Sequence, residues 1–343
     1  MKPRARDLDI EIGRLPTGPE NAITDVPGIR VGHTTLIEGD DVRTGVTVVL
    51  PPPEPLFAGA HRINGNGELT GLEWVRDSGL LTTPIGLTNT HSVGVVRDAL
   101  VAAAQHGEHQ HGERDWSLPV VGETWDGVLN DINGFHVKPE HVREALERAH
   151  DGPVEEGSVG GGTGMICHGF KGGIGTSSRV VEDGWMVGVL VQANHGRRAR
   201  LRVNGVPVGE KIGPDVVPLP GKPEGAGSII VLIATDAPLL PGQCERLSRR
   251  AGFGIARTGG MGEHTSGDFA FCFATGNRAL GTDQAEIPLR MLNDGRIDHL
   301  YEAVIDAVEE SIANAMLAAE TMTGRSGNTA YALPAELLRE ALA

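Results

Sequence analysis

The dipeptide Gly227-Ser228 could carry nucleophilic chemistry because of its place in the chain. It follows a stretch rich in Gly and Pro and precedes the apolar run of residues 229–234. If the chain is cut before Ser228, that residue gains a free α-amine next to its hydroxyl, and so supplies both a nucleophile and a base. An α-amine has a reference pKa of about 7.7 to 8.0, which leaves a neutral fraction at physiological pH. Because Gly-Ser is common in loops, the dipeptide alone favours a simpler interpretation, a small polar residue that opens a strand.

The segments on either side of this dipeptide are expected to differ sharply. Nearly half of residues 205–227 are Gly or Pro, so neither a helix nor a central strand should persist there, and we expect a flexible, exposed linker. Residues 229–234 are apolar and β-branched without a break, which is typical of a strand covered on both faces. Gly227 has no Cβ, so the carbonyl before Ser228 could adopt a strained geometry open to attack by the hydroxyl.

Further motifs occur in order along the chain. They are residues 23–33 (ITDVPGIRVGH), 60–65 (AHRING), 87–94 (LTNTHSVG), 123–132 (ETWDGVLNDI), 160–165 (GGGTGM), 169–176 (GFKGGIGT), 189–194 (VLVQAN) and 227–230 (GSII). With these motifs the chain resembles the DmpA-type L-aminopeptidase/D-esterase family, which includes the β-peptidyl aminopeptidases. The resemblance covers nearly the whole length.

This resemblance implies a fold and a processing event. The fold is of the α+β class, a four-layer αββα sandwich of the type shared with ornithine acetyltransferase, formed by residues 1–343 as a single self-processing domain. Cleavage between Gly227 and Ser228 would divide the chain into residues 1–227 and 228–343. The new N-terminus would lie at the interface between the two sheets. Hydrophobic pattern alone indicates no more than mixed α and β structure.

The resemblance also implies roles for individual residues. Ser228 matches the nucleophile, and Asn194 matches an asparagine that binds the oxyanion. Glu123 matches the acidic residue that receives the free ammonium group of the substrate. Ser266 and Asp268 match a pair that relays protons to the nucleophile, and as alternate residues entering a strand they can share one face.

Two observations leave parts of this site open. Residues 266–268 could instead be a polar turn before a buried strand, and His264 is a competing base two residues upstream. Trp125 stands where aminopeptidase relatives often carry a tyrosine that helps the oxyanion. An indole N–H donates but cannot accept, and the bulk of the indole should narrow the pocket, so the substrate selectivity should differ from that of the tyrosine-bearing relatives.

The periodicity of apolar residues predicts the main elements around the site. Expected strands are residues 45–50, 185–191 and 268–275, the last alternating large and small side chains as a strand between two layers would. Expected helices are residues 139–150, residues 241–257, a C-terminal segment with apolar residues at 300, 304, 308, 312 and 316, and a short helix from Pro334.

Two other groups of residues could indicate a different chemistry, nucleotide binding or metal binding. The glycines of residues 160–164 do not spell a nucleotide-binding motif, so we expect a loop where backbones approach closely. His106, His109 and His111 could converge on zinc, although residues 105–115 are polar and typical of a solvated loop. His33, His61 and His91 would serve either core hydrogen bonds or the lining of a pocket. We therefore expect no metal site and no cofactor.

Composition excludes several partners. The net charge of −15 argues against nucleic acid and anionic membranes, and no apolar run is long enough to span a bilayer. The basic residues near Met1 are not followed by the apolar stretch of a secretory signal. The odd number of cysteines, 3, has neither metal nor disulfide spacing, which favours a reducing cytoplasm.

The leading interpretation is a self-processing serine aminopeptidase or amidase that acts on small peptides, amides or esters. The alternatives are an oligoamide endohydrolase of the same family, an acyltransferase related to ornithine acetyltransferase, and an unprocessed binding protein. Because that acyltransferase normally exposes threonine, Ser228 counts against it. The resemblance further implies a homo-oligomer, with a tetramer favoured.

Overall fold

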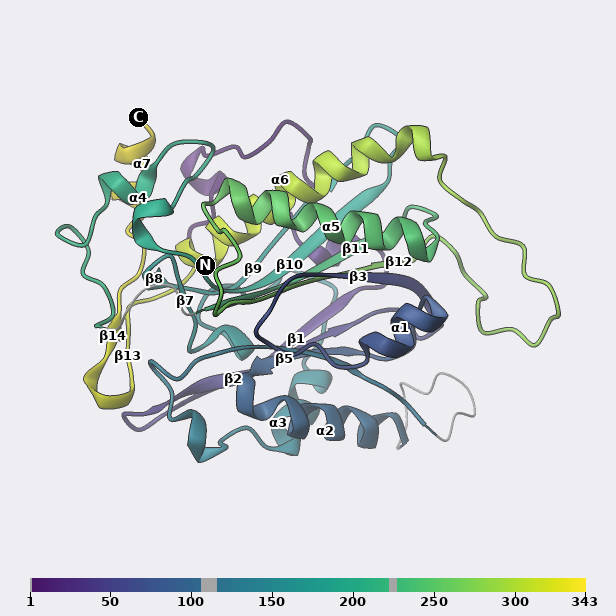
Figure 1. The fold of residues 1–343 in the computed structure, drawn as a ribbon, viewed down its shortest axis with the longest axis horizontal. Coiled ribbons are helices and arrows are strands. Elements are labelled where there is room, and N and C mark those ends of the chain that lie inside the picture. The colour runs from purple at the N-terminus through teal and green to yellow at the C-terminus, as the bar shows by residue number, and fades with distance from the viewer. Residues whose placement is uncertain (1, 106–115, 222–226) are drawn as a thin grey trace.

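The computed structural model describes residues 2–105, 116–221 and 227–343 (Figure 1). The histidines of the candidate zinc loop, His106, His109 and His111, lie outside the described residues, as does part of the linker at 222–226. Across the described ranges, no helix combines the length and the apolar character needed to cross a bilayer.

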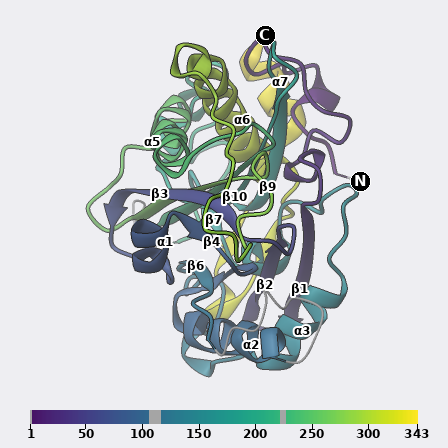
Figure 2. The same cartoon turned by 90° about the vertical axis from the view of Figure 1, so that its right-hand side faces the viewer.

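Two β-sheets face each other at the centre of the molecule, and helices cover their outer faces (Figures 1 and 2). The six-stranded sheet has the order β4 (Leu80–Leu81), β3 (Leu56–Gly65), β12 (Gly267–Ala274), β11 (Ser228–Thr235), β10 (Met186–Asn194) and β9 (Gly173–Val180). The four-stranded sheet has the order β1 (Arg30–Glu38), β2 (Val42–Leu50), β5 (Ile85–Asn89) and β6 (Val120–Thr124). This is the four-layer αββα arrangement that the family resemblance implied.

The helices divide between the two outer layers. The six-stranded sheet is covered by α5 (Pro241–Arg257) and α6 (Ile297–Leu317), and the four-stranded sheet by α2 (Val93–Gln105) and α3 (Pro139–Glu147). The smaller elements are α1 (Leu72–Ser78), α4 (Val208–Lys211), α7 (Ala335–Leu342), β7 (Ile166–Cys167), β8 (Phe170–Lys171), β13 (Met322–Thr323) and β14 (Thr329–Ala330).

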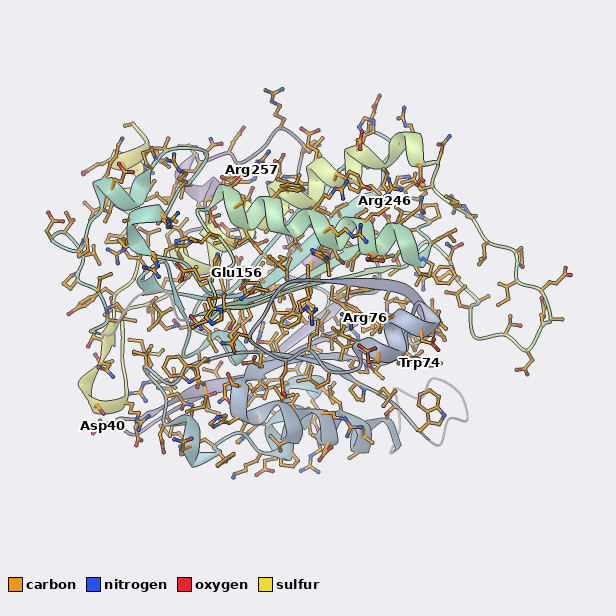
Figure 3. All side chains as sticks on the ribbon, viewed as in Figure 1. Asp40, Trp74, Arg76, Glu156, Arg246 and Arg257 are labelled. Atoms are coloured by element: carbon orange, nitrogen blue, oxygen red, sulfur yellow. The ribbon has the colours of Figure 1, made fainter. Side chains whose placement is uncertain are left out.

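Side chains fill the spaces between the four layers (Figure 3), where they form three buried clusters. Strand β12 shows how the sequence distributes side chains between two of these clusters. Phe269, Phe271 and Phe273 belong to the cluster between the two sheets, while Ala270 and Cys272 face the helices. Successive side chains of a strand point to opposite faces, so the large residues fill the space between the sheets and the small ones let α5 approach closely. The predicted packing of this strand between two layers is confirmed.

The elements expected from periodicity are present with small differences at their ends. The helix expected at 139–150 stops at Glu147, because the backbone of His150 instead bonds to Val31 at the edge of the four-stranded sheet, with distances of 2.9 and 3.1 Å. Pro334 is the N-cap of the last helix rather than its first residue.

The linker expectation was wrong for much of its length. Residues 208–211 form α4, and Val208, Ile212 and Val217 are buried in the cluster under α5 and α6. The buried Arg198 guanidinium donates to the carbonyls of Ile212 and Val217 at 3.1 and 2.9 Å. Gly and Pro weaken regular structure, but the apolar side chains between them gain free energy from burial, and this anchors the segment.

Candidate active site

Ser228 opens β11 between the ends of two neighbouring strands. The antiparallel register places Asn194, the last residue of β10, opposite Ser228, and the parallel register places Asp268 of β12 beside Ile229. The Ser228 side chain is buried, with 4% of its surface exposed, and its hydroxyl oxygen accepts the N–H of Gly267 at 3.3 Å. The end of β10 and the beginnings of β11 and β12, which are far apart in the sequence, therefore meet at one end of the six-stranded sheet.

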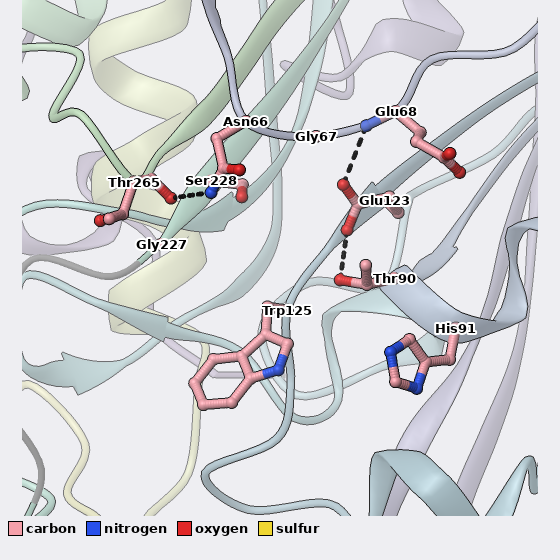
Figure 4. Close-up of a pocket in the computed structure, with 10 residues that line it drawn as sticks. All are labelled: Asn66, Gly67, Glu68, Thr90, His91, Glu123, Trp125, Gly227, Ser228 and Thr265. Carbon is pink, nitrogen blue, oxygen red and sulfur yellow. Dashed lines mark hydrogen bonds between the residues drawn. The ribbon is translucent and has the colours of Figure 1, made fainter.

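A cavity of about 550 Å³ opens at this point (Figure 4). Its lining residues come from both sheets and their loops, and they are Asn66, Gly67, Glu68, Thr90, His91, Glu123, Trp125, Gly227, Ser228 and Thr265. Of the residues assigned from sequence, this group includes Gly227, Ser228, Glu123 and Trp125.

Gly227 packs tightly against the end of β10. A Cβ added to this residue would lie 1.9 Å from the carbonyl oxygen of Asn194 and 3.1 Å from the Cα of His195. No other amino acid fits without moving that strand. The residue that precedes Ser228 is therefore a glycine because of close backbone approach.

Ser266 and Asp268 lie on the same face, as expected. The Ser266 hydroxyl donates to Oδ1 of Asp268 at 2.5 Å, and both side chains are buried. Burial raises the pKa of Asp268 to about 6, against the opposing effect of hydrogen bonds from Ser266 and the N–H of Ile229. Gly267, which lies between them, is the residue whose N–H contacts the Ser228 hydroxyl.

The turn that carries Ser266 is held by two asparagines at the end of β3. The Asn64 amide donates to the carbonyls of Glu263, at 2.7 Å, and of Ser266, and the Asn66 amide donates to Thr265 at 2.8 Å. His264, the competing base, is exposed and does not line the cavity. The geometry therefore favours the Ser266–Asp268 pair over His264.

Asn194 has its amide fixed at both ends. Its Oδ1 accepts the N–H of Ile166 at 2.8 Å, and its Nδ2 donates to the carbonyl of Trp125 at 2.9 Å. Nδ2 carries a second hydrogen, so the group can donate once more. A donor held in place before reaction is the requirement for stabilising an oxyanion.

Glu123 presents a buried carboxylate to the cavity from the end of β6 (Figure 4). Only 2% of its surface is exposed. One oxygen accepts the N–H of Glu68 at 3.0 Å, and the other accepts the hydroxyl of Thr90. Burial raises the pKa of Glu123, while these two hydrogen bonds and His91 lower it. No described residue forms an ion pair with this buried carboxylate, so it suits a cationic group of a ligand.

Several residues of the cavity were not found from sequence. His91 had been left between a core role and a pocket role, and it lines the pocket. Asn66, Gly67, Glu68 and Thr90 lie inside or beside the motifs of residues 60–65 and 87–94, and that nearness was the available signal.

The other histidines and the glycine cluster lie elsewhere. His33 is bonded to Thr47 at 2.9 Å, and burial lowers its pKa to about 4, so it is a neutral core residue. His61 is half-buried on β3. In the glycine cluster, a Cβ on Gly161 would lie 2.7 Å from the carbonyl of Leu87, which confirms the expected close approach of backbones.

Among the described residues, one group offers several metal-ligand atoms close together. Cys167, His168 and His195 are buried, and one donor atom from each lies within 4.8 Å of the others. Burial raises the pKa of the Cys167 thiol to about 12 and lowers that of His168 to about 4. Burial also lowers the pKa of His195 well below its usual value, so the three groups are neutral at physiological pH. Metal binding would require the thiol to lose its proton.

Comparison with known proteins agrees with this geometry. The model of Peptidase family S58 matches residues 21–330. The chain is 46% identical to the β-peptidyl aminopeptidase BapA of Sphingosinicella microcystinivorans over 367 residues, covering 99% of this chain and 92% of that protein. It is 42% identical to the β-peptidyl aminopeptidase BapA of Sphingosinicella xenopeptidilytica, covering 98% of this chain and 90% of that protein.

Solved structures show the same similarity. A β-aminopeptidase of Burkholderia sp. superposes with a TM-score of 0.92 at 53% identity, over 99% of this chain and 98% of that chain. The L-aminopeptidase D-Ala-esterase/amidase of Ochrobactrum anthropi superposes with a TM-score of 0.89 at 44% identity, with the same coverage. That protein is described as a prototype for the serine aminopeptidases and as a variant of the Ntn hydrolase fold.

Proposed function

This chain belongs to peptidase family S58 and is a serine aminopeptidase of the N-terminal nucleophile type, and we propose that Ser228 is its nucleophile. One observation carries this proposal. Ser228 is the first residue of a buried strand and lines a cavity that is also lined by Glu123. Asn194 lies opposite Ser228 on the neighbouring strand β10. A nucleophile, an oxyanion donor and a partner for an ammonium group therefore lie together.

The chain first activates itself by cleaving the bond between Gly227 and Ser228. The Ser228 oxygen attacks the carbonyl carbon of Gly227, the carbon–nitrogen bond breaks, and the nitrogen takes up a proton and becomes the new α-amine. Water then hydrolyses the ester and frees the Gly227 carboxylate. Since the nitrogen of Ser228 is still an amide at the start, the first proton must go elsewhere, and the Ser266–Asp268 pair accepts it.

Turnover of a substrate uses the amine that cleavage has created. The substrate ammonium pairs with Glu123, which places the adjacent carbonyl at Ser228. The Ser228 hydroxyl passes its proton to its own α-amine as it attacks, and the Asn194 amide stabilises the oxyanion. The leaving amine departs with a proton, and water hydrolyses the acyl-enzyme ester. The substrates are small peptides, amides and esters with a free amino group.

The processing event provides the test of this function. Denaturing electrophoresis of purified protein should show fragments 1–227 and 228–343, and N-terminal sequencing of the smaller fragment should begin Ser-Ile-Ile-Val. The processed protein should hydrolyse an aminoacyl p-nitroanilide and leave its N-acetylated form largely intact. An intact chain with full activity would rule out this mechanism.

We also propose a cytoplasmic location and a tetramer of cleaved protomers. The cysteines of the chain, Cys167, Cys244 and Cys272, are all free and buried, as in a reducing compartment. Light scattering on the processed protein would test the assembly, and a monomeric mass would contradict it.

A further inference from the structure

Phe135 is held in an unfavourable state at the surface. Its φ of 50° and ψ of 48° lie in the left-handed region, which a bulky side chain rarely adopts. Its ring is also 57% exposed to solvent. The tight turn η4 (Ile132–Gly134) comes directly before it, and a Cβ on Gly134 in this turn would lie 2.1 Å from Nε2 of His136. An exposed aromatic on a strained backbone is the kind of feature that a ligand contact accounts for.

The ring of Phe135 is connected to the active-site cavity through His91. The two rings stack with their centroids 5.9 Å apart and their planes 20° apart. His91 lines the cavity and directly follows Thr90, whose hydroxyl bonds to Glu123. Phe135 does not itself line the cavity, but it stacks on a residue that does, so its ring lies one side chain beyond the His91 wall.

The cavity has two unlike walls, and only one can accept a substrate side chain (Figure 4). The strand end with Asn66, Gly67 and Glu68 runs along one side. It lies so close that a Cβ on Gly67 would be 2.8 Å from Glu123 Oε1. The rings of Trp125 and His91 form the opposite side. A substrate anchored at Glu123 and Ser228 must therefore direct its side chain toward the rings.

We propose that Trp125, His91 and Phe135 form an aromatic subsite that accepts an aromatic or bulky apolar side chain on the amino-terminal residue of the substrate. This inference rests on the proposed function and adds a substrate class to it. A flat apolar side chain covers the exposed face of Phe135 and packs against rings already stacked on each other, which gives both area burial and favourable ring geometry.

The experiment compares two substrates on one variant. Phe135→Asn removes the ring but tolerates the left-handed backbone, so the turn is kept. For the p-nitroanilide of phenylalanine or β-homophenylalanine, kcat/KM should fall by roughly three- to tenfold, the range expected for one lost aromatic contact. For the p-nitroanilide of glycine or β-alanine, which has no side chain to place, kcat/KM should stay the same.

A second ring supplies the matched control. Phe253 on α5 is 59% exposed but lies in the helix layer over the six-stranded sheet, outside the residues that line the cavity. Phe253→Asn should leave the ratio between the two substrates unchanged. If Phe135→Asn also leaves this ratio unchanged, the subsite does not exist. If the variant changes the oligomeric mass and not the ratio, Phe135 serves an interface instead. If the wild-type protein hydrolyses neither substrate, the proposed function fails instead.

Discussion

Replacing Glu123 by glutamine tests the aminopeptidase site most directly. The change removes a charge but keeps the shape of the side chain. The glutamine oxygen can still accept the N–H of Glu68, and its nitrogen can donate to the Thr90 hydroxyl, so both hydrogen bonds seen in the structure can be retained. The variant should therefore fold and process itself, and any loss should concern the binding of the substrate ammonium.

The size of the loss follows from the burial of this carboxylate. An ion pair at about 4 Å with an effective dielectric of about 20 contributes roughly 4 kcal/mol. Glutamine keeps a neutral hydrogen bond of about 1 kcal/mol to the ammonium. The net loss of ~2–4 kcal/mol corresponds to a fall in kcat/KM of roughly 30- to 1000-fold.

The assay measures kcat/KM for free and N-acetylated aminoacyl p-nitroanilides. The free substrate should lose most of its rate in Glu123→Gln, and the acetylated one should change little. Because burial raises the pKa of Glu123, the wild-type enzyme should lose its preference for the free amine as the pH falls and the carboxylate becomes protonated. If wild type prefers the acetylated substrate and the variant keeps the same ratio, the aminopeptidase assignment of Glu123 is refuted and an oligoamide endohydrolase becomes the better interpretation.

Substitutions at three further positions probe the rest of the site. Ser228→Ala should remain one chain on a denaturing gel and lose activity, whereas Ser228→Thr should cleave itself slowly. If the alanine variant hydrolyses amides at the wild-type rate, the nucleophile is another residue. The rate of self-cleavage of the Ser228→Thr precursor should decline as the pH falls through about 6, because Asp268 then becomes protonated and can no longer accept a proton. Asp268→Asn should cleave itself slowly at every pH. A cleavage rate of the threonine precursor that does not change with pH would contradict this role of Asp268. Gly67→Ala places a methyl group 2.8 Å from Glu123 Oε1 and 3.1 Å from the Cα of Gly267. The value of kcat/KM should therefore fall roughly ten- to hundredfold with little change in Tm. Wild-type kinetics in this variant would show that the backbone at Gly67 moves to accommodate the methyl group.

The local sequence predicted the strand that begins at the proposed nucleophile, Ser228, and the strand beside it. The unbroken apolar run after Ser228 and the alternation of large and small residues after Asp268 each determine a buried strand, because burial of side chains on one or both faces follows directly from their spacing. The motifs that resemble the family added the four-layer fold. In the same way, Ser266 and Asp268 are close in sequence, and their contact follows from the period of the strand.

Local pattern failed where packing between distant segments decided the outcome. Residues 205–217 have the Gly and Pro content of a flexible linker, yet Val208, Ile212 and Val217 are buried against the helix layer. Arg198 also donates hydrogen bonds to the carbonyls of Ile212 and Val217. Composition reports the propensity of a segment alone. It does not report the apolar surface that another part of the chain offers to it.

The walls of the cavity were likewise decided by tertiary structure. Thr90 and Glu68 reach Glu123 from separate segments, and Phe135 stacks on His91, which lines the pocket. The sequence, through its resemblance to the family, predicted which residues act as nucleophile, acid–base pair and ammonium partner. Their distances and shared cavity depend on how two sheets pack face to face, and that packing is set by contacts between residues far apart in the chain.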